Sequence, residues 1–97
     1  MALLFRDALG EIIRERRLEL GMTLRQVQHK SKVALGYISE VERGHKEASS
    51  EVLNALAVAL GVDVSELVIE AGVRMKVWEL PNVVPTFDEM RVLSHSN

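Results

Sequence analysis

Two short amphipathic segments joined by a three-residue turn, between Thr23 and Gly44, constrain the fold of this chain more than any other feature. Thr23 and Gln26, three residues apart, form a capping-box pattern that predicts the start of the first helix. Arg43 before Gly44 predicts the end of the second helix, because a cation stabilises the last turn and glycine readily adopts positive φ. The residues predicted to face inward between the two helices are Val27, Ser31, Val33, Ile38 and Val41. Helices this short are not stable alone, so the rest of the chain must provide a core for them.

Three further helices are predicted from apolar residues at helical spacing. One spans Leu4–Leu20 and ends at Gly21. The next is capped by Ser49 and ends at Gly61, and the third opens at Asp63. Their predicted inner side chains are Leu9, Ile12, Ile13 and Leu20, then Leu53, Leu56, Ala57 and Leu60, then Val64, Leu67, Val68 and Ala71. The result is an all-α fold of five helices, whose central pair has the layout of a helix-turn-helix that can enter a DNA major groove.

The composition fits one small globular domain with an aliphatic core. The chain has 97 residues, of which 47% are apolar, 27% are charged and only 4% are aromatic. No apolar run reaches the roughly 18 residues of a membrane span, and Met1–Leu20 is too charged for a signal peptide. We therefore expect a cytoplasmic protein that contacts no membrane.

The residue types of enzymes and metal sites form no recognisable pattern here. The chain has no cysteine, which excludes disulfides and thiolate metal ligands. The spacing of His29, His45 and His95 does not match a metal site. Neither a glycine-rich phosphate loop nor a nucleophile paired with a base is evident. The sequence therefore predicts a protein that is not an enzyme and needs no cofactor or metal.

The basic residues gather around the two central helices. The whole chain has a net charge of −2, but Thr23–Lys46 has a net charge of +3 and the remainder has −5. The charged residues of this segment are Arg25, Lys30, Lys32, Arg43 and Lys46, against Glu40 and Glu42. A basic segment on an acidic body is the electrostatic footprint of a protein that neutralises DNA phosphates. The alternative is an ordinary solvated helix face.

Several motifs in this part of the chain resemble the Cro/C1-type (xenobiotic-response-element) helix-turn-helix family. They are Tyr37–Ser39, Val41–Gly44, Ser49 and the run Leu53–Gly61. The resemblance implies a compact, lambda-repressor-like domain over residues 1–71. It also implies a sequence-specific regulator that binds double-stranded DNA.

Two stretches most resemble the actinobacterial Clp-protease gene regulators within that family. They are Lys32–Gly44 and Lys46–Glu51. This resemblance implies an activator of protease and chaperone genes that is itself a substrate of the Clp protease. The alternative is a protein-interaction module, such as an antitoxin, that uses the helix-turn-helix as a scaffold. The basic segment favours the regulator, and the apolar tail leaves the alternative open.

The family reads bases mainly from the first half of its second helix, and the matching positions here are Leu35, Gly36, Ser39 and Glu40. Glu40 can accept a hydrogen bond from a cytosine amino group, or it can instead pair with Arg43 on the next turn. Tyr37 matches a family position that contacts phosphate or sugar. The alternative for Tyr37 is a half-buried aromatic ring whose hydroxyl lies in water.

Other predicted contacts reach the DNA backbone. The amide of Thr23 lies at a helix N-terminus, which attracts phosphate, and His45 and Lys46 fall in a loop that family members press against phosphates. Lys32 replaces the usual turn glycine, so either it tolerates a left-handed conformation at some cost or the turn differs from that of the family. In either case we expect Lys32 to contact a phosphate. The complete set of predicted DNA-binding residues is Thr23, Arg25, Lys32, Leu35, Gly36, Tyr37, Ser39, Glu40, Arg43, His45 and Lys46.

Some residues depart from the family pattern. Leu24 stands where many members carry a glutamine that grips the DNA backbone. Gln28 replaces a small residue, so it must either point outward or tilt the helix pair, and Ala34 cannot cap the second helix. The arginines of the first helix either contact phosphates or form a solvated basic face, and they are Arg14, Arg16 and Arg17.

The stretch after the predicted core, residues 72–97, is unusually apolar. We expect a C-terminal helical extension that forms a homodimer, because the only tryptophan lies there and tryptophan is enriched at interfaces. Thr86 and Glu89 form another capping pattern that predicts a short helix. The predicted dimerisation residues are Val73, Val77, Trp78 and Leu80. Such a dimer would read a near-palindromic site, whereas the alternative is a tail that folds back onto the monomer core.

Overall fold

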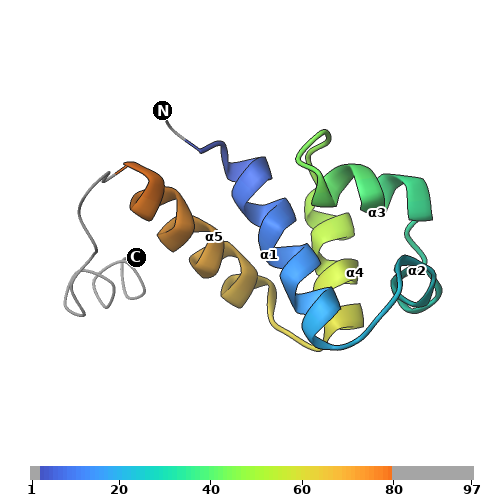
Figure 1. Cartoon of the computed structure of the whole chain (residues 1–97). Helices are drawn as coiled ribbons and strands as arrows, with labels where there is room; N and C mark the ends of the chain where they lie inside the picture. Colours follow the sequence, from blue (N-terminus) through green and yellow to red (C-terminus); the bar gives the residue numbers. More distant parts are fainter. Residues whose placement is uncertain (1–2, 80–97) are drawn as a thin grey trace.

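Five α-helices make up the part of the chain that the structure, a computed structural model, describes, residues 3–79 (Figure 1). They are α1 (Phe5–Glu19), α2 (Leu24–Ser31), α3 (Leu35–Glu42), α4 (Ser50–Leu60) and α5 (Val64–Glu79). α5 runs antiparallel along α1, while α3 and α4 pack on the other side of α1 and α2 packs against both of them (Figure 1). These residues contain no strand, so the expected all-α fold of five helices is confirmed.

The core is aliphatic, as the composition predicts, and all five helices contribute to it. Its buried side chains are Ala8, Leu9, Ile12, Ile13, Val27, Ile38, Val41, Leu53, Leu56, Ala57, Ala59, Leu60, Leu67 and Ala71. Two predicted core residues are wrong, because Leu20 is 54% exposed and Val68 is 40% exposed. Leu20 lies beyond the last residue of α1, and Val68 follows the buried Leu67 by one position, which turns its side chain about 100° around the helix.

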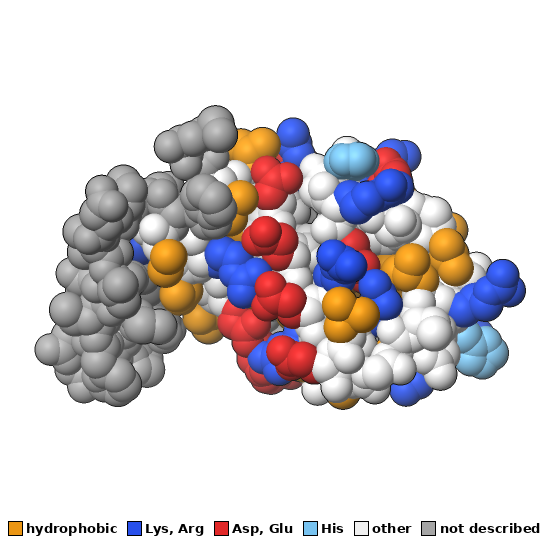
Figure 2. Space-filling model, viewed as in Figure 1, with side chains coloured by type: hydrophobic (Ala, Val, Ile, Leu, Met, Phe, Trp, Pro, Cys, Tyr) orange, Lys and Arg blue, Asp and Glu red, His pale blue; other side chains and the backbone are white. Residues whose placement is uncertain are grey.

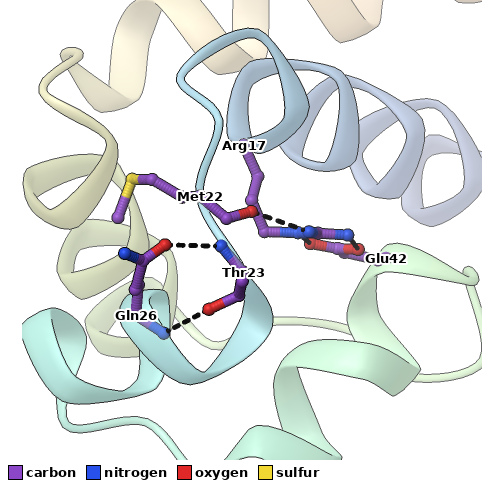
Figure 3. A network of polar contacts seen from close by, with 5 residues as sticks. All are labelled: Arg17, Met22, Thr23, Gln26 and Glu42. Carbon is purple, nitrogen blue, oxygen red and sulfur yellow. Dashed lines mark hydrogen bonds and ion pairs between the residues drawn. The ribbon is translucent and has the colours of Figure 1, made fainter.

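Side-chain caps begin α2 and α4 as predicted. The Thr23 hydroxyl accepts from the Gln26 amide at 3.1 Å, and the Thr23 amide donates to Oε1 of Gln26 at 2.8 Å, which completes the capping box (Figure 3). Ser49 accepts from the Val52 amide at 3.2 Å at the start of α4. Ala34 provides no side-chain cap, so α3 begins without one. Side-chain caps therefore fix where α2 and α4 begin, whereas the start of α3 depends on the turn before it.

The turn between α2 and α3 depends on a left-handed lysine. Lys32 has φ 64°, as expected where it replaces glycine, and its amide donates to the Gln28 carbonyl at 2.8 Å. Ser31 is half-buried, and its hydroxyl accepts from the Val33 amide at 3.1 Å. Ser31 therefore stabilises the turn in addition to its predicted position between the two helices.

α5 continues without a break across the proposed boundary between residues 71 and 72. Met75 still packs against the core, and the helix ends at Glu79. The side chain of Trp78, all of Leu80 and the helix predicted at Thr86–Glu89 lie outside the described residues. The proposed role of residues 72–97 therefore stays a prediction.

Within residues 3–79, no single helix is long and apolar enough to cross a membrane. The pair α4 and α5 reaches that length and composition only together, across a bend of 101° between them. Each of the two helices contributes one buried face to the core described above.

Candidate nucleic-acid interface

α3 is buried on one face and open on the other, as the prediction for the second helix of the pair requires. Ile38 and Val41 are 0% and 2% exposed and hold the helix on the core. On the outer face Gly36 is exposed, and a side chain added there would have no atom within 4 Å. Leu35 and Ser39 are half-buried beside it. The outer face can therefore be approached closely along the backbone of its first turns.

The carboxylate of Glu40 lies between two neighbouring basic side chains. Arg43 donates to Oε1 of Glu40, and Nδ1 of His45 lies 3.5 Å from Oε2. The pairing of Glu40 with Arg43, one of its two predicted roles, is present. Any base that takes a hydrogen bond to Glu40 must therefore compete with Arg43 for the carboxylate.

Tyr37 ties the loop after α3 to the helix. The ring is half-buried, as one of the two predicted alternatives has it, and its hydroxyl donates to the Glu47 carbonyl at 2.6 Å. Nζ of Lys46 lies 5.9 Å from the centre of the Tyr37 ring, a cation–π contact that orients the lysine. From α1, Arg6 donates to the Gly44 carbonyl at 3.1 Å. The loop that carries His45 and Lys46 is thus held from two helices.

A buried ion pair holds the C-terminal end of α3 against α1. Nε and Nη2 of Arg17 donate to the Glu42 carboxylate at 2.7 and 3.0 Å, and Nη1 donates to the Met22 carbonyl at 3.0 Å (Figure 3). The hydrogen bond to Glu42 raises the pKa of the Arg17 guanidinium. Arg17 is only 9% exposed, so both predicted alternatives, a phosphate contact or a solvated face, are wrong for this residue. No local pattern indicates this pair, because Arg17 and Glu42 are 25 positions apart and each lies among other charged residues.

Gly10 brings the backbones of α1 and α3 into direct contact beside that ion pair. A side chain at Gly10 would overlap the Val41 carbonyl oxygen and lie 2.7 Å from the carbonyl oxygen of Glu42. Only glycine permits this approach, so the angle between α1 and α3 depends on it. This role could not be predicted from the sequence, because nothing in the local pattern distinguishes Gly10 from other helical positions.

Ion pairs that are more exposed to solvent than Arg17–Glu42 join α1 to α5. Arg74 donates to both oxygens of Glu15 at 2.6 and 2.9 Å and lies 3.6 Å from Glu11, and Arg16 donates to Glu70. Arg16, predicted to contact phosphate or to lie on a solvated basic face, is half-buried and paired with a carboxylate of α5. The hydrogen bond from Arg74 lowers the pKa of Glu15. In Figure 2 this seam is the red and blue band in the middle of the view, and basic side chains prevail to its right.

The remaining candidate residues lie on α2 and around two hollows. Thr23, Arg25, Lys32 and the outward-pointing Gln28 are exposed, the last as predicted. Arg25 and Lys32 line an open hollow of ≈ 830 Å³ on the outer side of α2. A second hollow of ≈ 580 Å³ brings together Ser39, Arg43 and His45 with Leu24 and with Arg14 of α1. In the described part of the chain, no three metal-ligating side chains are grouped to hold an ion.

Two of the four candidate dimerisation residues, Val73 and Val77, have described side chains. Val73 is half-buried and Val77 is 44% exposed, both on α5. Val68 and Ile69, each 40% exposed, lie one to two turns before them and were not predicted as interface residues. The outer side of α5 therefore presents an apolar strip to solvent.

Comparisons with known proteins agree with this arrangement. A model of the helix-turn-helix family matches residues 13–67, from the middle of α1 into α5. "Transcriptional regulator ClgR" of Mycobacterium tuberculosis is 48% identical over 75 residues, which cover 77% of this chain and 67% of that protein. This chain thus spans about two thirds of the length of that relative.

Solved structures show the same arrangement of helices. The clp gene regulator ClgR from Corynebacterium glutamicum superposes with a TM-score of 0.77 at 43% identity, covering 81% of this chain and 84% of that one. The restriction-modification controller protein C.Esp1396I, solved as a tetramer in complex with its natural 35-base-pair operator, has a TM-score of 0.64 at 26% identity. That match covers 71% of this chain and 95% of the controller protein.

Proposed function

Since this chain belongs to the helix-turn-helix family, of the Cro/C1 type, we propose that it is a dimeric activator of Clp protease and chaperone genes. Members of this family are sequence-specific transcription regulators that bind double-stranded DNA, and they are not enzymes. The observation that carries the proposal is the 48% identity to a Clp gene regulator, which extends over three quarters of this chain. The same five helices superpose on a second protein of that name.

Base readout is assigned to the exposed outer face of α3. Gly36 leaves room for the helix to approach the bases, Leu35 can contact a thymine methyl, and Ser39 can donate or accept a hydrogen bond. Glu40 is placed to accept from a cytosine amino group, in competition with Arg43. The support for this assignment is that the opposite face of α3 is fully used by the core.

Phosphate binding is assigned to the cations and donors around that face. Lys46 and Arg43 are exposed on the loop and at the end of α3, and His45 lies between them in sequence. The Thr23 amide already donates to Gln26, so the proposed role of Thr23 is to cap the N-terminus of α2, whose dipole favours a phosphate. The remaining proposed contacts are Arg25, Lys32 and Tyr37. Because the Tyr37 hydroxyl already donates to Glu47, its proposed role is to hold Lys46 and the loop in position.

Dimerisation is assigned to α5 and the residues after it. The apolar strip of Val68, Ile69, Val73 and Val77 supports this, and Trp78 and Leu80 would extend it. A two-fold dimer would place two copies of α3 about 34 Å apart, which favours a near-palindromic operator. The C.Esp1396I controller, a tetramer on its operator, shows that a related fold assembles on DNA.

Two further proposals follow from the relatives' names and family. The protein acts in the cytoplasm, where its operator DNA is, and it is itself a substrate of the Clp protease. The second proposal is tested by incubating the full chain with the assembled Clp protease and ATP. Loss of the intact chain over time supports the proposal, and a chain that persists while a known substrate is degraded contradicts it.

The test of the proposed function is selection of bound sites from random duplex DNA at about 0.15 M salt, where non-specific binding is weak. An enriched inverted repeat is the expected result. The Glu40→Ala variant selected in parallel should prefer a different base at one position of each half-site. No enrichment by a folded protein would instead indicate a protein-interaction module.

A further inference from the structure

The three arginines in the second half of α1 have three different surroundings. Arg17 is buried against Glu42, and Arg16 donates to Glu70 on α5. Arg14 is exposed, and within residues 3–79 it has no hydrogen bond or ion pair. Its guanidinium is therefore available to an outside partner, although sequence reasoning placed all three arginines in one class.

Arg14 lies at the rim of the hollow between α1, the start of α2 and α3. The hollow has a volume of ≈ 580 Å³, and Ser39, Arg43 and His45 line its α3 side. These three residues belong to the proposed DNA-binding helix and the loop after it. The hollow therefore lies next to the proposed base contacts. An anion in this hollow would touch α1 and α3 at once.

The charges around the hollow favour an anion. The Arg17–Glu42 pair also lines it, but its two charges neutralise each other and all its strong donors are used within the protein. Arg43 shares its charge with Glu40. Leu24, on the α2 side, has no donor. The uncompensated charge at this site is therefore that of Arg14, and the Ser39 hydroxyl is the neutral donor beside it.

We propose that Arg14, with Ser39 and Arg43, binds a backbone phosphate of the bound duplex. A guanidinium offers two parallel N–H donors to a phosphate, which suits a contact at the edge of a groove. The contact adds α1 to the DNA-binding surface, outside the helix-turn-helix itself. This inference rests on the proposed function, because it needs a bound duplex.

Arg14→Gln tests the inference, with Arg16→Gln as the matched control. Both variants remove one positive charge from exposed or half-exposed positions of the same helix, two residues apart. Arg14→Gln should weaken binding to the selected duplex on the order of tenfold and reduce the salt slope by about one unit per protomer. Arg16→Gln should leave both quantities unchanged. Arg14→Lys should keep the salt slope and recover part of the affinity, since lysine keeps the charge but not the paired donors.

Results that differ from these expectations would contradict either the phosphate contact of Arg14 or the proposed function. Unchanged affinity and slope for Arg14→Gln, with wild-type protein that binds the duplex, would contradict the phosphate contact alone. Equal losses of duplex affinity for Arg14→Gln and Arg16→Gln would mean that only the net charge of the protein matters, which contradicts a specific contact by Arg14. Failure of the wild type to bind any duplex would contradict the proposed function. Titration with inorganic phosphate, followed by the NMR signal of the Arg14 Nε–H, distinguishes the source of the ligand. A saturable shift of this signal, together with an unchanged duplex affinity of Arg14→Gln, would indicate that the site binds a free anion and not the DNA backbone.

Discussion

The two sides of α1 are both joined to their neighbours by arginine–carboxylate pairs, yet they perform different tasks. On the α3 side, Arg17 and Glu42 are buried, and their side chains are only 11% and 5% exposed. On the α5 side, Arg74 pairs with Glu15 and Glu11, whose side chains are 52% and 48% exposed. The same residue types therefore experience different solvation within one small protein.

This contrast indicates which contact positions α3, the proposed DNA-binding helix. A buried pair is strongly directional, and removing one partner leaves an uncompensated charge in the protein interior. An exposed pair gains little, because water solvates both charges when they separate. We infer that Arg17–Glu42 and the close contact at Gly10 set the orientation of α3, whereas the α1–α5 seam depends mainly on its apolar core contacts.

The largest expected effect is that of Arg17→Met. It leaves Glu42 buried without a partner, which should lower the free energy of unfolding by about 3–5 kcal/mol. Urea denaturation measures the loss. Combining Arg17→Met with Glu42→Leu should restore most of the stability, because the pair is then replaced by apolar side chains. A loss below 1 kcal/mol for the single variant would contradict the importance of this contact.

Gly10→Ala is expected to have the next largest effect. The added methyl group would overlap the carbonyl oxygens of Val41 and Glu42, so α1 and α3 must separate, at a cost of about 1–3 kcal/mol. Gly36→Ala is the control, since that position is helical and has open space, and it should be neutral or stabilising by up to about 1 kcal/mol. If the two alanine variants were equally stable by thermal unfolding, the close contact would not constrain the fold.

Arg74→Gln probes the other side of α1 and should have a smaller effect. It removes the exposed pairs with Glu15 and Glu11, and the expected loss is about 0.5 kcal/mol. The loss should shrink further at high salt, because solvent-exposed pairs are screened. Denaturation in low and high salt measures this loss of stability. A loss as large as that of Arg17→Met would mean that the ion pairs on the α3 and α5 sides of α1 contribute equally to stability.

The smallest expected effect is a pH dependence from Glu15. Its pKa in the folded protein lies below the ordinary value of 4.5, because Arg74 donates hydrogen bonds to it. Ionised Glu15 therefore stabilises the fold above that value, and the contribution disappears as the pH falls through the lowered pKa. Wild type and Glu15→Gln should differ slightly at neutral pH and converge in acid, as followed by unfolding at a series of pH values. A difference in stability between wild type and Glu15→Gln that increased at acid pH would contradict the predicted direction of the pH dependence.

The sequence predicted the parts of this structure that depend on local patterns. The Thr23 capping box, the left-handed Lys32 and the Glu40–Arg43 pair each involve residues within one turn of helix, and all three are present. The Arg17–Glu42 pair joins residues 25 positions apart, and its members look like ordinary surface charges in a periodic pattern.

The same limit explains the other differences. Gly10 acts through the backbone of a distant helix, which no local spacing reveals. Arg14, Arg16 and Arg17 are nearly adjacent in sequence, but the helix directs their side chains toward three different surroundings. Fold class was therefore accessible from the sequence, and the pairings that orient the candidate site were not.

The central claim is that duplex DNA binds across α2, α3 and the loop after α3. The most direct measurement is a titration of the ¹⁵N-labelled protein with the selected duplex, followed by amide chemical shifts. We expect the largest shifts at Thr23, along the first half of α3 and at His45–Glu47, with small shifts along the α1–α5 seam. Large shifts confined to α5, with those of α3 unchanged, would contradict it.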